Sequence, residues 1–203
     1  MKRVMGSLLL FAVVGCGHNG TKAGVASAPS YLRSGSAAAG LTRLINKPTV
    51  RICYTDASNS AQHQDDVKFA VLSWIEPLRS LTTDELATSV ELTADGDCDA
   101  SVMIGNYSVA YTEIGTHPVV HLSYSGWYGS RTVTLHEFGH AFGLLDTYMG
   151  RGGACQRGQP DSVMCWASYT TLQPDDVAGV RDVYQRVLSG QLKLADERSF
   201  TVQ

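Results

Sequence analysis

Two histidines and a glutamate stand close together at residues 136–140, and their spacing suits metal-assisted hydrolysis. His136 and His140 are four residues apart, which places both imidazoles on one face of an α-helix. Two imidazoles in that arrangement can bind one Zn²⁺. Glu137 is rotated by roughly 100° from His136 around the helix axis, so it can reach a water bound to the metal. The pattern therefore predicts a catalytic zinc site in which Glu137 is the general base.

A catalytic zinc also needs a third protein ligand, and the residues after the second histidine offer one. Gly143 lies three residues after His140 and can adopt the positive φ that ends a helix and turns the chain back. Asp146 follows three residues later and would supply a carboxylate oxygen. We therefore expect His136, His140 and Asp146 to hold the ion, with one position left open for water.

The residues from His136 to Tyr148 resemble the zinc site of the metzincin endopeptidases. The metzincin motif usually ends in histidine, and the HExxHxxGxxD form found here is similar to the small secreted bacterial proteases of the snapalysin type. Those proteases carry a tyrosine two residues after the aspartate, and Tyr148 matches it; it would polarise the scissile carbonyl or form a wall of the site. Metzincins also place a methionine in a tight turn below the zinc. Met164 stands in a loop rich in turn-forming residues and would be that apolar floor.

The resemblance implies an α+β fold for residues 47–190, with a twisted mixed sheet of four to five strands, an upper helix, the zinc helix and a C-terminal helix. Hydrophobic patterns predict strands at 49–54, 90–93, 100–105 and 118–124 and a helix over 61–80 that Pro77 kinks or ends. Residues 107–114 are ambiguous, and 172–184 resemble the C-terminal helix of matrixin-type metzincins. We expect the strand at 118–124 to form the sheet edge with which an extended peptide substrate pairs.

The N-terminal residues predict export. Residues 1–15 have a basic start and an apolar run too short to span a bilayer, as in a signal peptide. Small residues before Cys16 resemble a bacterial lipobox, which predicts lipidation of Cys16 and an anchor in the cell envelope, at the outer membrane, with ordinary secretion as the alternative. Residues 16–46 are rich in Gly, Ala and Ser and predict a flexible tether, or else a short pro-segment. Residues 191–203 are expected to form a loose C-terminal tail.

Charge and cysteine count limit the function further. The chain has 203 residues and a formal net charge of −3, so we expect no nucleic-acid partner. Of its five cysteines, Cys16 would carry lipid, and the even remainder suggests two disulfides in an exported protein. Three connectivities are possible. We predict Cys53–Cys98 and Cys155–Cys165, because the second pair brackets the methionine loop.

Other candidate metal sites are weaker. The DGDCD run at 95–99 offers oxygen ligands for Ca²⁺, but it lacks the spacing of an EF-hand loop and is better interpreted as a solvated turn. We expect His63 in solvent. His117 and His121 are expected at the surface or on the substrate side, with a structural metal site as the alternative. The cysteines have no CxxC spacing, so we do not expect them to bind zinc.

Together these patterns predict an exported, monomeric zinc endopeptidase that hydrolyses peptide bonds in proteins. One alternative is a zinc-containing surface lipoprotein that binds a partner without catalysis, although such a module has no need of Glu137. A second alternative is a zinc peptidase that acts on peptidoglycan cross-links. Activity on purified cell walls compared with activity on denatured protein would separate the two kinds of hydrolase.

Overall fold

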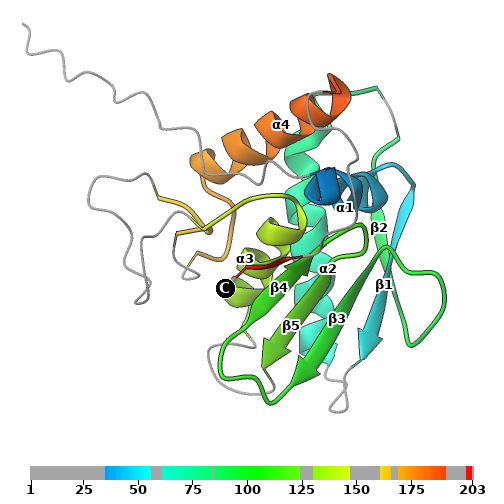
Figure 1. Ribbon diagram of the computed structural model, residues 1–203, viewed down its shortest axis with the longest axis vertical. Helices are drawn as coiled ribbons and strands as arrows, with labels where there is room; N and C mark the ends of the chain where they lie inside the picture. The colour runs from blue at the N-terminus through cyan, green and yellow to red at the C-terminus, as the bar shows by residue number, and fades with distance from the viewer. Residues whose placement is uncertain are drawn as a thin grey trace, which may run out of the picture.

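The computed structural model describes residues 35–55, 61–83, 85–123, 130–146, 161–165, 169–190 and 200–202. These residues form an α+β fold built on one mixed sheet (Figure 1). The strands are β1 (Thr49–Thr55), β2 (Ser89–Thr93), β3 (Ala100–Gly105), β4 (Tyr111–Ile114), β5 (Val119–Ser123) and β6 (Phe200–Val202). The helices are α1 (Gly35–Ile45), α2 (Ala61–Ile75), the 3₁₀ helix η1 (Glu76–Leu78), α3 (Arg131–Ala141) and α4 (Pro174–Leu188).

The sheet has the strand order β2-β1-β3-β5-β4-β6. Strands β2, β1, β3 and β5 are mutually parallel, whereas β4 runs antiparallel to β5 and β6 runs antiparallel to β4. Helix α2 connects β1 to β2, which is the crossover that two parallel strands require. The expected α+β fold with a mixed sheet is confirmed. The sheet has six strands instead of the expected four to five, because residues 200–202 add the last one.

Strand β5 lies inside the sheet and not at its edge. Val120 pairs with Val102 of β3 on one side and with Thr112 of β4 on the other. The prediction that residues 118–124 form the sheet edge was therefore wrong. The antiparallel strand β4 comes instead from the ambiguous segment 107–114. Its four residues alternate between partly buried and buried positions, a pattern too short to be recognised in the sequence.

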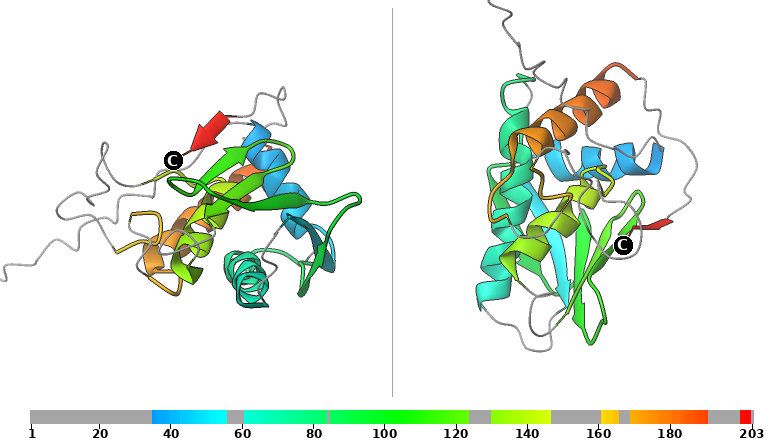
Figure 2. Two further views of the ribbon diagram at one scale, coloured as in Figure 1. Left: turned by 90° about the horizontal axis from the view of Figure 1, so that it is seen from below. Right: turned by 90° about the vertical axis from the view of Figure 1, so that its left-hand side faces the viewer.

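The helices supply the apolar layer that covers the sheet. Helices α2 and α3 lie on the same face of the sheet, while α1 and α4 lie across its upper end (Figure 2). Trp74 of α2 is fully buried, and its indole N–H donates to the carbonyl of Leu135 in α3 at 2.8 Å. The expected effect of Pro77 is also observed: α2 ends at Ile75, and Pro77 lies in the 3₁₀ turn that follows.

Helix α1 lies within the range that the sequence assigned to a tether. Leu41, Leu44 and Ile45 recur at helical spacing and are almost completely buried in the main core. Part of the range expected to be a tether, 16–46, therefore forms a helix that contributes core residues from Leu41 onward. The sequence did not predict this helix, because the Gly, Ala and Ser content of residues 16–46 indicated a tether and three apolar residues at helical spacing were not recognised within it.

A disulfide joins Cys53 at the end of β1 to Cys98 in the turn before β3, the pairing expected from the sequence. Cys165 is also disulfide-bonded. The predicted partner Cys155 lies outside the described residues, as does Cys16. Among the helices of the described ranges, none is both long and apolar enough to cross a membrane.

Candidate metal centre

Three side chains from α3 and the turn after it converge on one point. The Nε2 atoms of His136 and His140 lie 3.0 and 3.4 Å from Oδ1 of Asp146. One potential ligand atom from each residue lies within 4.8 Å of the others. Both histidines are buried, and Asp146 is mostly buried. Over the ranges that the structure describes, this is the one group of three or more histidine, cysteine or acidic side chains placed to hold a metal ion.

The local sequence explains this convergence. Ser130 has an extended backbone, and its hydroxyl accepts from the amide of Val133, which starts α3. The helix places the two histidines one turn apart on one face. At its end Gly143 adopts a φ of 92°, a left-handed conformation that favours glycine, and its amide donates to His140 O at 2.9 Å. This turn directs the following chain back toward the histidine face, so that Asp146 meets both imidazoles.

Each imidazole is fixed by a hydrogen bond on its other nitrogen. Nδ1 of His136 donates to the carbonyl of Val163 at 2.8 Å, and Nδ1 of His140 donates to the carbonyl of Leu144 at 2.8 Å. A carbonyl only accepts, so Nδ1 carries a proton in both rings, which leaves Nε2 of each ring as the atom able to bind a metal ion. Metal-binding histidines in proteins are oriented in this way by their outer partners.

Charge and burial are strongly coupled at this point. Burial alone would lower the pKa of His136, but the Asp146 carboxylate, 3.0 Å away, and the negative charge of Glu137 outweigh it and raise the pKa to about 9. Burial would raise the pKa of Asp146, yet the two imidazoles hold it well below its usual range. A positive charge at His136 therefore balances Asp146, and a divalent cation at the same point would replace the proton.

The donor atoms fit a tetrahedral zinc ion. Nε2 of His140 and Oδ1 of Asp146 are buried and have no hydrogen-bond partner, which is a costly state unless an ion occupies the point between them. Donor atoms at about 2.0–2.1 Å from a tetrahedral zinc lie about 3.3 Å from one another. The two separations from Asp146 Oδ1, 3.0 and 3.4 Å, are close to that value, and all three ligand atoms lie within 4.8 Å of one another. Two imidazoles and one carboxylate leave a fourth position for water or substrate, as catalytic zinc sites do.

Glu137 lies beside these ligands and is held by a strand. Its side chain is buried, and burial raises the pKa of its carboxyl group, while the nearby imidazoles and a hydrogen bond to Thr112 act in the opposite direction. The Thr112 hydroxyl in β4 donates to Glu137 Oε2 at 2.8 Å. The carboxylate is thus in a dry environment with one oxygen fixed, an arrangement suited to proton transfer. Sequence reasoning missed Thr112, because no local pattern connects it to a residue 25 positions away.

Met164 is fully buried and packs against the backbone of α3 between the two histidines. A Cβ placed on Gly139 would overlap the sulfur of Met164 and would lie only 2.8 Å from Cζ2 of Trp74. Gly139 therefore lets the methionine approach the helix closely. A role for Met164 as the floor of the metal site stays a prediction. Met164 contributes no ligand atom to the cluster.

Asp176 of α4 holds the methionine loop in place. Its fully buried carboxylate accepts from the Ser162 hydroxyl at 2.6 Å, from the Val163 amide at 2.9 Å and from the Gln173 amide at 2.8 Å. The carbonyl of the same residue, Val163, accepts from Nδ1 of His136. Val163 therefore links Asp176, through its amide, to a metal-ligand candidate, through its carbonyl. The sequence indicated Asp176 only as an acid at the positive end of a helix.

The DGDCD segment forms a turn in which basic groups engage the carboxylates of Asp97 and Asp99. Gly96 has a φ of 109°. Asp97 pairs with Arg43 at 3.0 Å, and Asp99 pairs with Lys47 and accepts from the Arg51 amide. These contacts agree with a turn, and the segment contributes no ligand to the one metal-ion cluster of the described residues.

The remaining histidine candidates lie outside the cluster. His121 is buried, stacks on Tyr111 and contacts Glu113 at 3.0 Å, and the His117 ring bonds to the Ser101 hydroxyl at 2.8 Å. His121 is thus buried in the sheet and not at the exposed surface that the sequence suggested. His63 lies on α2, apart from the ligands. Tyr148, the predicted second catalytic residue, lies outside the described residues.

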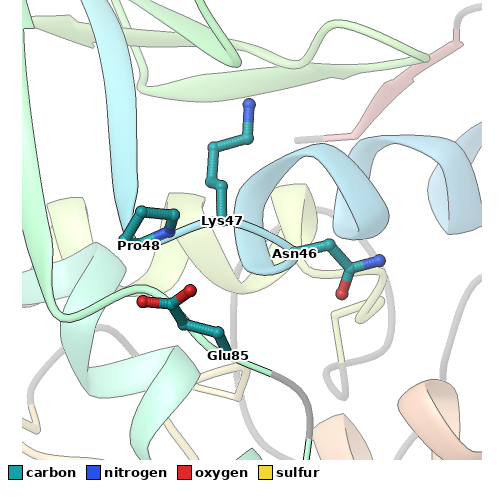
Figure 3. A pocket seen from close by; sticks show the side chains of 4 residues that line it. All are labelled: Asn46, Lys47, Pro48 and Glu85. Atoms are coloured by element: carbon teal, nitrogen blue, oxygen red, sulfur yellow. The ribbon is translucent and has the colours of Figure 1, made fainter.

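A surface pocket elsewhere shares no residue with the cluster. It is lined by Asn46, Lys47, Pro48 and Glu85 at the connection between α1 and β1 (Figure 3). The Lys47 ammonium group is already paired with the carboxylate of Asp99. Nothing in this lining supplies a nucleophile or a set of metal ligands, so we assign it no part in the chemistry.

The fold and the site together define a zincin-like protein of the metzincin class. A helix carries two histidines and a glutamate, a glycine turn returns an aspartate to them, and a buried methionine packs against the same helix. The chain is 31% identical over 130 residues to the "Extracellular small neutral protease" of Streptomyces caespitosus. The matched region covers 62% of this chain and 91% of that protein. No family model matches the chain. The chain belongs to the family of this small neutral protease, the snapalysin-type metzincins.

Proposed function

We propose that the protein is a secreted zinc-dependent endopeptidase that hydrolyses peptide bonds in proteins. The observation that carries this proposal is the convergence of His136, His140 and Asp146 on one buried point. The similarity to an extracellular neutral protease supports it. The disulfide between Cys53 and Cys98 also fits an exported protein, since such bonds persist in oxidising compartments.

The residues of the chain divide the reaction between them. His136, His140 and Asp146 would hold the zinc, which when bound supplies Lewis-acid chemistry and makes a water acidic enough to react near neutral pH. Glu137 accepts the proton of the attacking water and donates it to the leaving amine nitrogen. Its dry surroundings favour that cycle, because a carboxyl group with a raised pKa both takes up and releases a proton readily.

Two further assignments rest on the sequence. Tyr148, two residues after Asp146, would polarise the scissile carbonyl or form a wall of the site, as the resemblance implies. Cys16 would carry a lipid that anchors the protein to the cell envelope. Replacing Cys16 by serine should move the protein from the membrane fraction to the medium. If the distribution does not change, secretion without an anchor is the correct description.

The decisive experiment compares zinc-loaded wild type with Glu137→Gln. The substitution keeps the shape of the side chain but removes the base, so the variant should retain one zinc per chain and lose about 10²- to 10⁴-fold in kcat on denatured protein. Glu91→Gln is the matched control, because Glu91 is largely exposed on β2 and touches no site residue. Full activity of Glu137→Gln would refute the mechanism. Activity on purified cell walls but not on protein would identify a peptidoglycan peptidase instead.

A second experiment tests the third ligand. Asp146→Ala should lower zinc affinity strongly, because two imidazoles alone leave the ion poorly held. Asp97→Ala is the control, since Asp97 is exposed and lies in a turn apart from the site. Metal content measured after dialysis against a chelator gives the readout. If Asp146→Ala retains zinc as well as wild type, another group completes the metal shell.

A further inference from the structure

Thr112 of β4 forms a hydrogen bond with Glu137 of α3, 25 residues later in the sequence. Its buried hydroxyl lies 2.8 Å from Glu137 Oε2 and 3.0 Å from the Glu137 carbonyl oxygen. We infer that Thr112 is a positioning residue for the general base, holding one carboxylate oxygen so that the other faces the reacting water. This inference rests on the proposed function of Glu137.

The hydroxyl has one proton and can donate to only one of these oxygens at a time. The carbonyl of Glu137 lies within α3, where a helix carbonyl normally accepts from the amide four residues later. The carboxylate is charged and buried, so it gains more from the hydroxyl than the carbonyl does. The Thr112 hydroxyl therefore donates its hydrogen bond to Oε2 of Glu137.

The strand makes this donor rigid. Thr112 is paired with Val120 in β5, and β4 packs against α3, so the hydroxyl cannot move away from the helix without breaking the sheet. A glutamate side chain has three rotatable bonds, and without such a contact it would populate several rotamers. The sheet thus supplies a fixed donor to a flexible catalytic side chain, which is a form of preorganisation.

The test uses Thr112→Val, which keeps the shape of the side chain and removes the donor. We expect kcat to fall about 10- to 100-fold, as is usual for loss of an outer partner in a metal site, with KM and zinc content nearly unchanged. Thr112→Ser keeps the hydroxyl and should restore most of kcat. Thr134→Val is the matched control, because Thr134 is a buried threonine of α3 whose hydroxyl donates to Ser130 O at 3.0 Å, away from the ligands.

A second readout does not depend on catalysis. The ¹³C resonance of the Glu137 carboxyl carbon in the metal-free protein, identified by its loss in Glu137→Gln, should shift in Thr112→Val and stay in place in Thr134→Val. An unchanged resonance together with an unchanged kcat would overturn the role of Thr112. If instead the wild type hydrolyses nothing but the resonance still shifts, the proposed function fails while the contact stands.

The outer edge of β4 carries an independent observation. Residues 200–202 pair with it antiparallel, with Ile114 opposite Phe200 and Thr112 opposite Val202 (Figure 1). An extended peptide adds to a sheet edge through its backbone in this same manner. The edge in question belongs to the strand whose Thr112 side chain touches Glu137.

We propose that residues 200–202 occupy this edge of β4 in competition with an extended substrate. The proposal rests on the proposed function, because it assumes that the substrate must lie along the same strand to reach Glu137. An occupant on the same chain acts at a high effective concentration, so it raises the apparent KM without altering the chemical step.

Deleting residues 200–203 tests this proposal. The KM for an extended peptide substrate should fall about threefold or more, with kcat within about twofold of wild type. A synthetic peptide of residues 197–203 should inhibit the shortened enzyme competitively, whereas a scrambled peptide should not. An unchanged KM would overturn the proposal. Hydrogen exchange at the β4 amides should increase on deletion even in the absence of any activity, which separates failure of this proposal from failure of the proposed function.

Discussion

Replacing Asp176 by alanine should destabilise the protein and loosen the methionine loop. The carboxylate is fully buried and accepts from the Ser162 hydroxyl and from the amides of Val163 and Gln173, at 2.6 to 2.9 Å. Alanine leaves these donors without an acceptor in the interior. The loss therefore includes both the hydrogen bonds and the desolvation of the orphaned donors.

The magnitude follows from those contacts. A hydrogen bond to a charged group contributes about 1.5 to 3 kcal/mol, and a buried donor left unpaired costs about 1 to 3 kcal/mol. The three contacts act as one unit and are not additive, so we expect a loss of about 3 to 5 kcal/mol in the free energy of unfolding. That would lower Tm by roughly 6 to 20 °C for a chain of this size. It would be a large part of a total stability of about 5 to 15 kcal/mol.

Urea denaturation monitored by tryptophan fluorescence measures this loss. Asp182→Ala is the matched control, because Asp182 lies on the same helix in a partly exposed pair with Arg186 and should change stability by less than about 1 kcal/mol. Zinc dissociation should also be faster in Asp176→Ala. Without the Asp176 carboxylate the Val163 amide is no longer held, so the Val163 carbonyl that accepts from His136 is less firmly placed. A loss below about 1 kcal/mol with unchanged zinc release would refute the reasoning.

Three further predictions concern other parts of the fold. Burial and the adjacent Asp176 carboxylate raise the pKa of Asp175 to about 6, so its ionisation costs stability that is lost as pH rises from about 4 to about 6. Asp175→Asn should therefore add about 1 to 3 kcal/mol at pH 7.5 and almost nothing at pH 4, measured by urea denaturation. Gly139→Ala should cost about 1 to 3 kcal/mol despite its better helix propensity, because the new Cβ overlaps Met164; an increase in Tm would contradict this packing. Removing the Cys53–Cys98 bridge by a double serine substitution should cost about 4 kcal/mol for its 45-residue separation, and an unchanged midpoint in urea would show that the bridge contributes little.

Local patterns predicted the elements that have a clear period or composition. Strand β1 and the helix from residue 61 were located within a few residues, because their apolar positions recur regularly. Strand β4 and helix α1 were not predicted. The first has only four residues, and the second begins in a Gly- and Ala-rich segment whose three core residues are visible only once they are seen packed. The edge position expected for residues 118–124 depended on strand order, which local patterns do not contain.

The sequence by itself determined the chemistry available to this protein. The spacing of His136, Glu137 and His140 on one helix, and a glycine followed by Asp146, specify a metal site through local geometry alone, because one helical turn and one tight turn are enough to bring those groups together. Only the tertiary structure decided which groups hold them. Thr112 reaches Glu137 because the distant strand β4 packs on α3, and Asp176 of the distant helix α4 acts through its bonds to Ser162 and Val163 in the methionine loop.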